Sequence, residues 1–177
     1  MKDKLNIESP NILPRQRIIY GVILSIALVW CAGILIAPLW AGATDFRGNV
    51  SAFIYLLFSK NCHQLDDRSL HLCGNKLGVC SRCTFIYFSF LGATILYPFI
   101  RKLNNIQLPA LWILLLGTSL VIIDAGMDIF DLAQNTFMSR EITGGILGAI
   151  LPFYLIPGTI RLFEEFFTVP KAKQQKS

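Results

Sequence analysis

The stretch IIYGVILSIALVWCAGILIAPL, from Ile18 to Leu39, contains 22 residues and no charge. A helix of about 20 apolar residues is long enough to cross the hydrocarbon core of a bilayer. The run also exceeds the roughly 7–15 apolar residues of a secretory signal peptide, so we interpret it as an uncleaved membrane helix. This stretch therefore predicts an integral membrane protein.

Three further apolar runs follow the first, at residues 84–100, 108–123 and 142–160. The chain is 54% hydrophobic and 15% charged, whereas soluble domains are typically about 25% charged. We therefore predict an all-α, polytopic membrane protein whose four-helix transmembrane bundle occupies residues 18–163.

Prolines and glycines add detail to the last two predicted helices. Pro109 is placed for the first turn of the third helix, where its missing N–H costs nothing. Pro152 and Pro157 should kink the inner half of the fourth helix. Gly144 and Gly148 lie four residues apart and should form a small-residue face that lets helices pack closely.

The distribution of basic residues predicts the orientation. With four crossings, ten Lys and Arg residues fall on the side of the termini and the 101–107 loop, and six fall on the other side. Basic residues favour the cytoplasmic side of a membrane. We predict that the N-terminal segment 1–17 and the tail 164–177 are cytoplasmic, in a prokaryotic inner (plasma) membrane. The net charge of +5 is explained by these flanking residues, so the expected partner is the lipid bilayer and not nucleic acid.

One loop, 60–83, holds four of the five cysteines and both histidines in the sequence KNCHQLDDRSLHLCGNKLGVCSRC. The preceding residues, 49–60, are apolar but too short to span, and predict a helix lying in the membrane interface. Cysteine and histidine are the usual ligands of zinc. We predict an extracytoplasmic site for zinc or another transition metal, with these candidate ligands: Cys62, His63, Cys73, Cys80 and Cys83.

Two other chemistries suit the same cysteines. A Cys-x-x-Cys pair at a helix start has a lowered thiol pKa, and Arg82 between the pair adds positive charge. Such a pair can exchange disulfides with a membrane quinone, in an arrangement similar in outline to the vitamin K epoxide reductases. Alternatively, two disulfides staple a loop outside the cytoplasm, as in an accessory membrane protein. The sequence leaves the three chemistries open and names no reaction.

A set of polar residues is predicted to support this site: Gln64, Arg68, Arg82, Asp124 and Arg140. Asp124 directly follows an apolar run, where a carboxylate needs a partner. We expect Arg140, ahead of Arg82, to be that partner. Asp128 and Asp131 follow Asp124 at helical spacing, on one face if the third helix continues outward; we expect these two to be solvated.

The loop resembles the signature of an uncharacterised family of small membrane proteins, domain of unknown function 2085. That signature reads Cys-His-Gln, Arg-Ser, a Cys, and Cys-x-Arg-Cys-Thr-Gly-Ile-Tyr. This chain matches it at Cys62, His63, Gln64, Arg68, Ser69, Cys73, Cys80, Arg82, Cys83, Thr84, Ile86 and Tyr87. Phe85 replaces the family's glycine. The family has a second motif, an Asp near the end of a membrane helix and a later Arg-x-x-Thr-Gly. Asp124 and the run Arg140-x-x-Thr143-Gly144 resemble it. The resemblance covers roughly residues 50–150 and implies a membrane protein with a shared site but no known activity.

Overall fold

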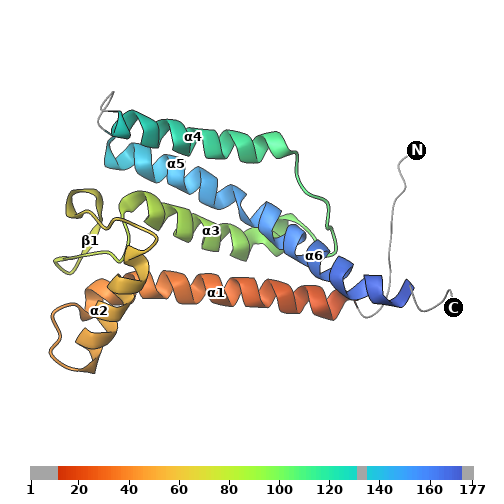
Figure 1. Cartoon of the computed structure of the whole chain (residues 1–177), viewed down its shortest axis with the longest axis horizontal. Helices are drawn as coiled ribbons and strands as arrows, with labels where there is room; N and C mark the ends of the chain where they lie inside the picture. The colour runs from red at the N-terminus through yellow and green to blue at the C-terminus, as the bar shows by residue number, and fades with distance from the viewer. Residues whose placement is uncertain (1–11, 131–134, 173–177) are drawn as a thin grey trace.

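The computed structural model describes residues 12–130 and 135–172, and these residues are mainly helical (Figure 1). The helices are α1 (Ile12–Trp40), α2 (Phe46–Ser59), α3 (Ser81–Ile100), α4 (Leu111–Ile129), α5 (Phe137–Ile150) and α6 (Pro152–Ala172). Between α2 and α3 the loop contains a 3-10 turn, Asp66–Arg68, and two short antiparallel strands, β1 (His71–Leu72) and β2 (Asn75–Lys76).

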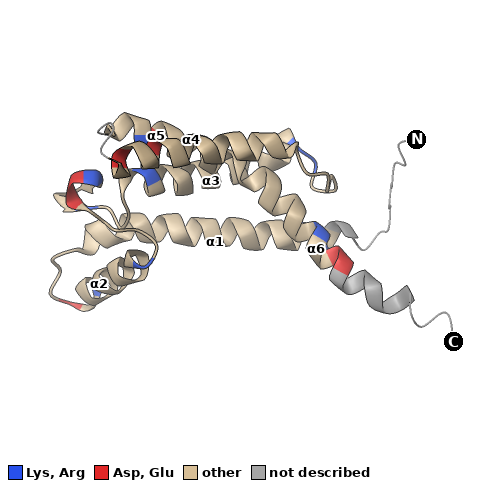
Figure 2. Cartoon of the chain, turned by 45° about the horizontal axis from the view of Figure 1, so that its top comes forward, with Lys and Arg blue, Asp and Glu red and all other residues tan. Residues whose placement is uncertain are grey.

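Four segments of the described residues are long and apolar enough to cross a membrane: Pro14–Trp40, Ser81–Ile100, Leu111–Ile129 and Phe137–Glu165. Their charged side chains gather toward the two ends, and the middle of the bundle is uncharged (Figure 2). The predicted all-α membrane fold with four spans is therefore confirmed. We call the end that carries α2 and the 60–83 loop the cysteine end, and the opposite one the terminal end.

The start and the end of α4 differ from the prediction. The helix begins at Leu111 with Ala110 as its N-cap, so Pro109 precedes the helix and does not lie in its first turn. At the other end α4 continues to Ile129, because Asp124 and Asp128 both have partners and neither acid stops the helix. Asp131 lies outside the described residues.

The fourth span is broken at Pro152, as predicted, whereas α6 continues as one helix through Pro157. Leu151 is the C-cap of α5, and Pro152 is the first residue of α6, where a proline is well tolerated. Pro152 cannot donate to the carbonyl one turn earlier, so α6 leaves the line of α5 and crosses toward α1 (Figure 1). There the Gln16 amide of α1 donates to Glu164 Oε1 at 3.0 Å.

Two glycines of α5 allow the closest helix contact in the bundle. A Cβ atom on Gly144 would lie 2.6 Å from the carbonyl oxygen of Arg82, and one on Gly148 would collide with the carbonyl of Ile86. Both carbonyls belong to α3. The predicted small-residue face is therefore confirmed, and it packs α5 directly on the backbone of α3.

The last turns of α1 hold the cysteine loop through their carbonyl groups. Pro38 has no N–H, so the carbonyl of Ile34, one turn earlier, has no helical donor. Gly78 N of the loop donates to that carbonyl at 3.4 Å. A Cβ atom at position 78 would lie 3.0 Å from the Phe58 ring, so any larger residue there would press on that ring. The loop is thus placed by a backbone contact that proline and glycine make possible.

Two more carbonyls of this helix end accept side-chain hydrogen bonds. The four last carbonyls of any helix lack helical donors. Ala37 O accepts from Ser51 Oγ of α2 at 2.7 Å, and Pro38 O accepts from Asn75 Nδ2 of β2 at 3.1 Å. These bonds fix α2 and the hairpin on the end of α1.

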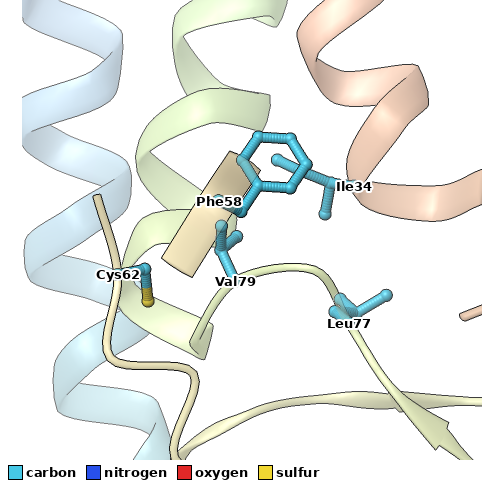
Figure 3. Close-up of a cluster of buried hydrophobic side chains, with 5 residues drawn as sticks. All are labelled: Ile34, Phe58, Cys62, Leu77 and Val79. Atoms are coloured by element: carbon cyan, nitrogen blue, oxygen red, sulfur yellow. The ribbon is translucent and has the colours of Figure 1, made fainter. Parts of the chain in front are cut away.

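An apolar cluster fills the space between α1, α2 and the loop (Figure 3). It consists of these buried residues: Ile34, Phe58, Cys62, Leu77 and Val79. The cluster therefore fixes the position of Cys62, whose neighbours Cys80 and Cys83 pack against the same side chains.

Candidate metal centre

Three cysteine sulfurs converge at the start of α3. The ligand atoms of Cys62, Cys80 and Cys83 all lie within 4.8 Å of one another. Cys62 comes directly after α2, where its N–H still donates to Phe58 O at 2.9 Å. Cys80 is the N-cap of α3, and Cys83 lies in the first turn of that helix. The Cys-x-x-Cys motif and one distant cysteine therefore form a single group.

The first turn of α3 stabilises negative charge on Cys62. The backbone N–H of Cys80 donates to Cys62 Sγ at 3.2 Å, and a helix N-terminus carries a partial positive charge. Hydrogen bonds from the thiols of Cys80 and Cys83 hold the pKa of Cys62 well below its usual range. The same hydrogen bond with Cys62 raises the pKa of Cys80. The hydrogen bonds therefore favour the thiolate form at Cys62 and the protonated form at Cys80.

Gln64 fixes the chain that follows Cys62. Its Nε2 donates to the carbonyls of Tyr55 at 2.9 Å and Gly78 at 2.7 Å, and so ties α2 to the segment before Cys80. Its own carbonyl accepts from Lys76 Nζ at 2.9 Å. The backbone of Gln64 has a φ of 50°, a left-handed conformation that this network holds in place. Gln64 thus links the end of α2, before Cys62, to the segment that leads to Cys80.

The three cysteines line one side of a pocket of about 480 Å³. The pocket lies between the loop and helices α3, α4 and α5, and its lining includes His63, Arg68, Arg82, Asp128 and Arg140. His63 is exposed and is not part of the three-sulfur group. The predicted supporting arginines therefore reach the same cavity as the thiols.

Two carboxylates of α4 pair with these arginines, but not in the predicted arrangement. Arg82 Nη2 donates to Asp124 Oδ2, so Arg82 and not Arg140 is the partner of Asp124. The pairing differs because α4 continues for another turn and carries Asp128 to the level of Arg140. Arg140 Nη2 lies 3.3 Å from Asp128 Oδ1, and Arg68 Nη1 lies 2.5 Å from Asp128 Oδ2. Asp128 is therefore paired, contrary to the expectation that it is solvated.

Cys73 and His71 lie apart from the sulfur group, in the hairpin. Cys73 is exposed, and its φ of 52° places it in the tight turn between β1 and β2. The ring of His71 lies 3.3 Å from Asp66 Oδ1, at the exposed edge of the loop. All five cysteines are within the described residues and have free thiols. The structure thus brings together three of the five predicted ligands.

Four apolar spans and a thiol pocket at one end define an integral membrane protein. This chain belongs to the family described as predicted membrane protein DUF2085, whose profile matches residues 62–154. It is also 34% identical, over 141 residues, to an uncharacterized protein of the archaeon Methanocaldococcus jannaschii; the alignment covers 78% of this chain and 90% of that protein. No solved structure matches the chain. The matched family segment begins at Cys62, and it contains all three sulfurs and all three arginines of the pocket.

Proposed function

We propose that this protein is a metal-binding membrane protein, in which Cys62, Cys80 and Cys83 hold zinc or a similar transition metal. The convergence of the three sulfurs carries the proposal. Zinc–sulfur bonds of about 2.3 Å in a tetrahedron require sulfurs about 3.8 Å apart, so sulfurs within 4.8 Å need only a small contraction. The N–H donated to Cys62 Sγ supports this reading, because such contacts orient and stabilise metal-bound thiolates.

Three cysteines would leave one coordination position of a tetrahedral ion for another ligand. Structural zinc sites are closed by four protein ligands, whereas reactive sites keep one position for water or a substrate. Of the two remaining predicted ligands, His63 lines the pocket and Cys73 lies in the exposed hairpin turn. A three-cysteine centre with an open position is therefore the arrangement that we propose, and it suits a metal-assisted reaction or the handling of the metal itself.

We place the cysteine end outside the cytoplasm, with both chain termini inside, in a prokaryotic inner membrane. The support is the excess of basic residues on the terminal side, ten against six, since the positive-inside bias acts on short loops of this kind. In this orientation the metal centre takes its ion or its substrate from the extracytoplasmic side.

Metal analysis of the purified full-length protein, combined with a count of reactive thiols, tests the proposal. We expect one transition metal ion per chain, and three additional reactive thiols after chelation. The Cys73→Ser variant should keep its metal and lose only one reactive thiol. Protein that has no affinity for added zinc, with all its loop thiols reactive from the outset, would refute the metal centre.

A second candidate function is supported by an apolar groove that α3 helps to form. The groove has a volume of about 390 Å³ and lies between α1, α3 and α6; its lining includes Trp30, Tyr87 and Phe90. Tyr87 is one helical turn from Cys83, so an isoprenoid tail in the groove would bring a quinone ring near the thiols. Oxidation of Cys80 and Cys83 to a disulfide would then pass two electrons and two protons to the quinone, which becomes a quinol.

The two candidates differ in what the thiols do. A redox pair predicts that quinone analogues oxidise two thiols per chain and that no metal is retained. A metal centre predicts the reverse: bound metal protects the thiols from the quinone analogue. The same purified sample therefore decides between them.

A further inference from the structure

We infer that the pocket beside the cysteines binds a phosphate group, held by the guanidinium groups of Arg68, Arg82 and Arg140. This inference goes beyond the proposed metal centre, because it depends on the arginines of the pocket and not on the sulfurs. Its ligand class is a phosphate monoester or diester, either free in solution or as the headgroup of a lipid.

The pocket contains more hydrogen-bond donors than its own acids can satisfy. Three guanidiniums carry about fifteen N–H donors, and the three carboxylates that pair with them, Asp67, Asp124 and Asp128, offer about twelve acceptor positions. Asp128 pairs with both Arg68 and Arg140. Asp124 accepts hydrogen bonds from Arg82 and, at 3.4 Å, from the hydroxyl of Thr143. The Nε atom of Arg82 is buried and has no hydrogen-bond partner among the described residues. An acceptor-rich ligand would use this donor excess.

The lining of the pocket also favours an anion. It contains three arginines and one carboxylate, that of Asp128; Asp67 and Asp124, which pair with Arg68 and Arg82, lie outside the lining. The Arg140 side chain is only 9% exposed and that of Arg82 is 19% exposed, so water screens these guanidinium groups poorly. Guanidinium groups match the geometry of phosphate oxygens, with two parallel N–H bonds.

The place of the pocket favours a ligand that comes from the membrane edge. The lining includes Ile129 at the end of the membrane span of α4, and Ile129 and Phe130 are largely exposed, as expected for side chains that contact lipid. Arg68 lies at the mouth, with its side chain 39% exposed. A headgroup phosphate could therefore reach the arginines while its acyl chains stay beside α4.

Binding measurements on full-length protein in phosphate-free detergent test the inference. The probes are inorganic phosphate, dihexanoyl phosphatidylglycerol, and dihexanoyl glycerol as the uncharged match. Each is titrated by calorimetry into metal-loaded and into chelated protein, and metal content is measured on the same samples. We expect saturable binding of at least one phosphate probe and none of dihexanoyl glycerol. Tighter binding of the phospholipid identifies the headgroup as the source, and tighter binding of inorganic phosphate identifies the free anion.

The variants Arg68→Gln and Arg68→Lys show whether the arginines hold the ligand. Losing one charge-assisted hydrogen bond should weaken binding about tenfold in Arg68→Gln. Arg68→Lys keeps the positive charge but cannot make a bidentate hydrogen bond, so it should also bind the phosphate probe more weakly. The matched control is Arg47→Gln, an exposed residue of α2 at the cysteine end that pairs with Asp45; its affinity should not change. Absence of saturable binding, or equal affinity in the Arg68 variants and the control, would overturn the inference. A sample that binds phosphate but no metal would refute only the metal centre.

Discussion

Arg82, between the two cysteines of the Cys-x-x-Cys motif, pairs with Asp124 on the neighbouring helix α4. One residue thus links the sulfur group to the acidic end of α4, although α5 is the helix that packs against both α3 and α4. The Asp124 side chain is 10% exposed, so this carboxylate relies on its partner and not on water. The pair therefore belongs to the framework that holds α4 beside the thiols.

Breaking the Arg82–Asp124 pair should destabilise the protein strongly. Removal of one partner leaves the other charge buried and unpaired, which costs about 3–5 kcal/mol. We expect Arg82→Gln and Asp124→Asn each to lower the free energy of unfolding in detergent by this amount. The double variant should lose less than the sum of the two. The exposed pair Arg47–Asp45 serves as the control and should show little coupling, because water screens it; strictly additive losses at Arg82 and Asp124 would refute the pairing.

Single serine substitutions at Cys80 and Cys83 should be as damaging as the double substitution. Two of the three sulfurs cannot hold an ion tightly, so each of Cys62→Ser, Cys80→Ser and Cys83→Ser should reduce bound zinc to background. Elemental analysis after purification measures this loss. Cys73→Ser is the matched control and should retain one ion per chain. Retention of the metal in the Cys62 variant would mean that another residue, such as His63, completes the site.

The metal affinity should rise with pH. A metal binds thiolates, so bound protons must leave as the ion enters. The Cys62 contact raises the pKa of Cys80, so Cys80 is protonated at neutral pH and loses its proton on binding. Each proton released should increase the affinity about tenfold per pH unit until the pH passes the pKa of that thiol. Competition with a chromophoric chelator at pH 6, 7 and 8, corrected for the chelator's own titration, measures the slope; a flat profile would contradict a thiolate site.

Alanine at Gly148 should force α5 away from α3. A Cβ there meets the carbonyl oxygen of Ile86, which belongs to the helix backbone and cannot move aside. Overpacking of this kind costs roughly 1–3 kcal/mol. The control is Gly92→Ala, in α3, where a Cβ has no neighbour within 4 Å; this change should stabilise the helix by up to about 1 kcal/mol. Thermal unfolding in detergent compares the two, and an equal midpoint for both variants would refute the close packing.

The orientation of the chain can be tested with an impermeant maleimide on intact cells. Cys73 is exposed, so the test uses a Cys73→Ser background. We expect labelling of Asn49→Cys on α2 and no labelling of Asn104→Cys in the loop between α3 and α4; both positions are exposed. The opposite pattern would place the thiols in the cytoplasm, where a reducing environment disfavours disulfides.

The number of membrane spans could be predicted because each span contains a charge-free run of sufficient length. The break before Pro152 and the glycine face of α5 were also predictable, since they depend on local backbone chemistry. The end of α4 was harder to place. Asp124 marks the end of an apolar run, but the helix continues because Arg82 and Arg140 pair with its acids. A pairing that depends on the neighbouring helix is not visible in a local pattern.

In the candidate site, too, some features follow from the local sequence and others depend on contacts between distant segments. The motif identified Cys80 and Cys83 as a pair, but it could not separate Cys62 from Cys73 as the third sulfur. That choice depends on the apolar cluster around Cys62 and on the hairpin that turns Cys73 outward. The signal that could have helped is Gly74, because glycine is favoured at the positive φ angles of a two-residue hairpin turn.

The attachment of the loop to α1 makes the sulfur group depend on the end of the first span. Ile34, Ala37 and Pro38 hold the loop and α2 through main-chain oxygens. These oxygens lie in the right places only while the last turns of α1 are helical. The spacing of the three thiols is therefore inherited from a membrane helix that contributes none of the three sulfurs.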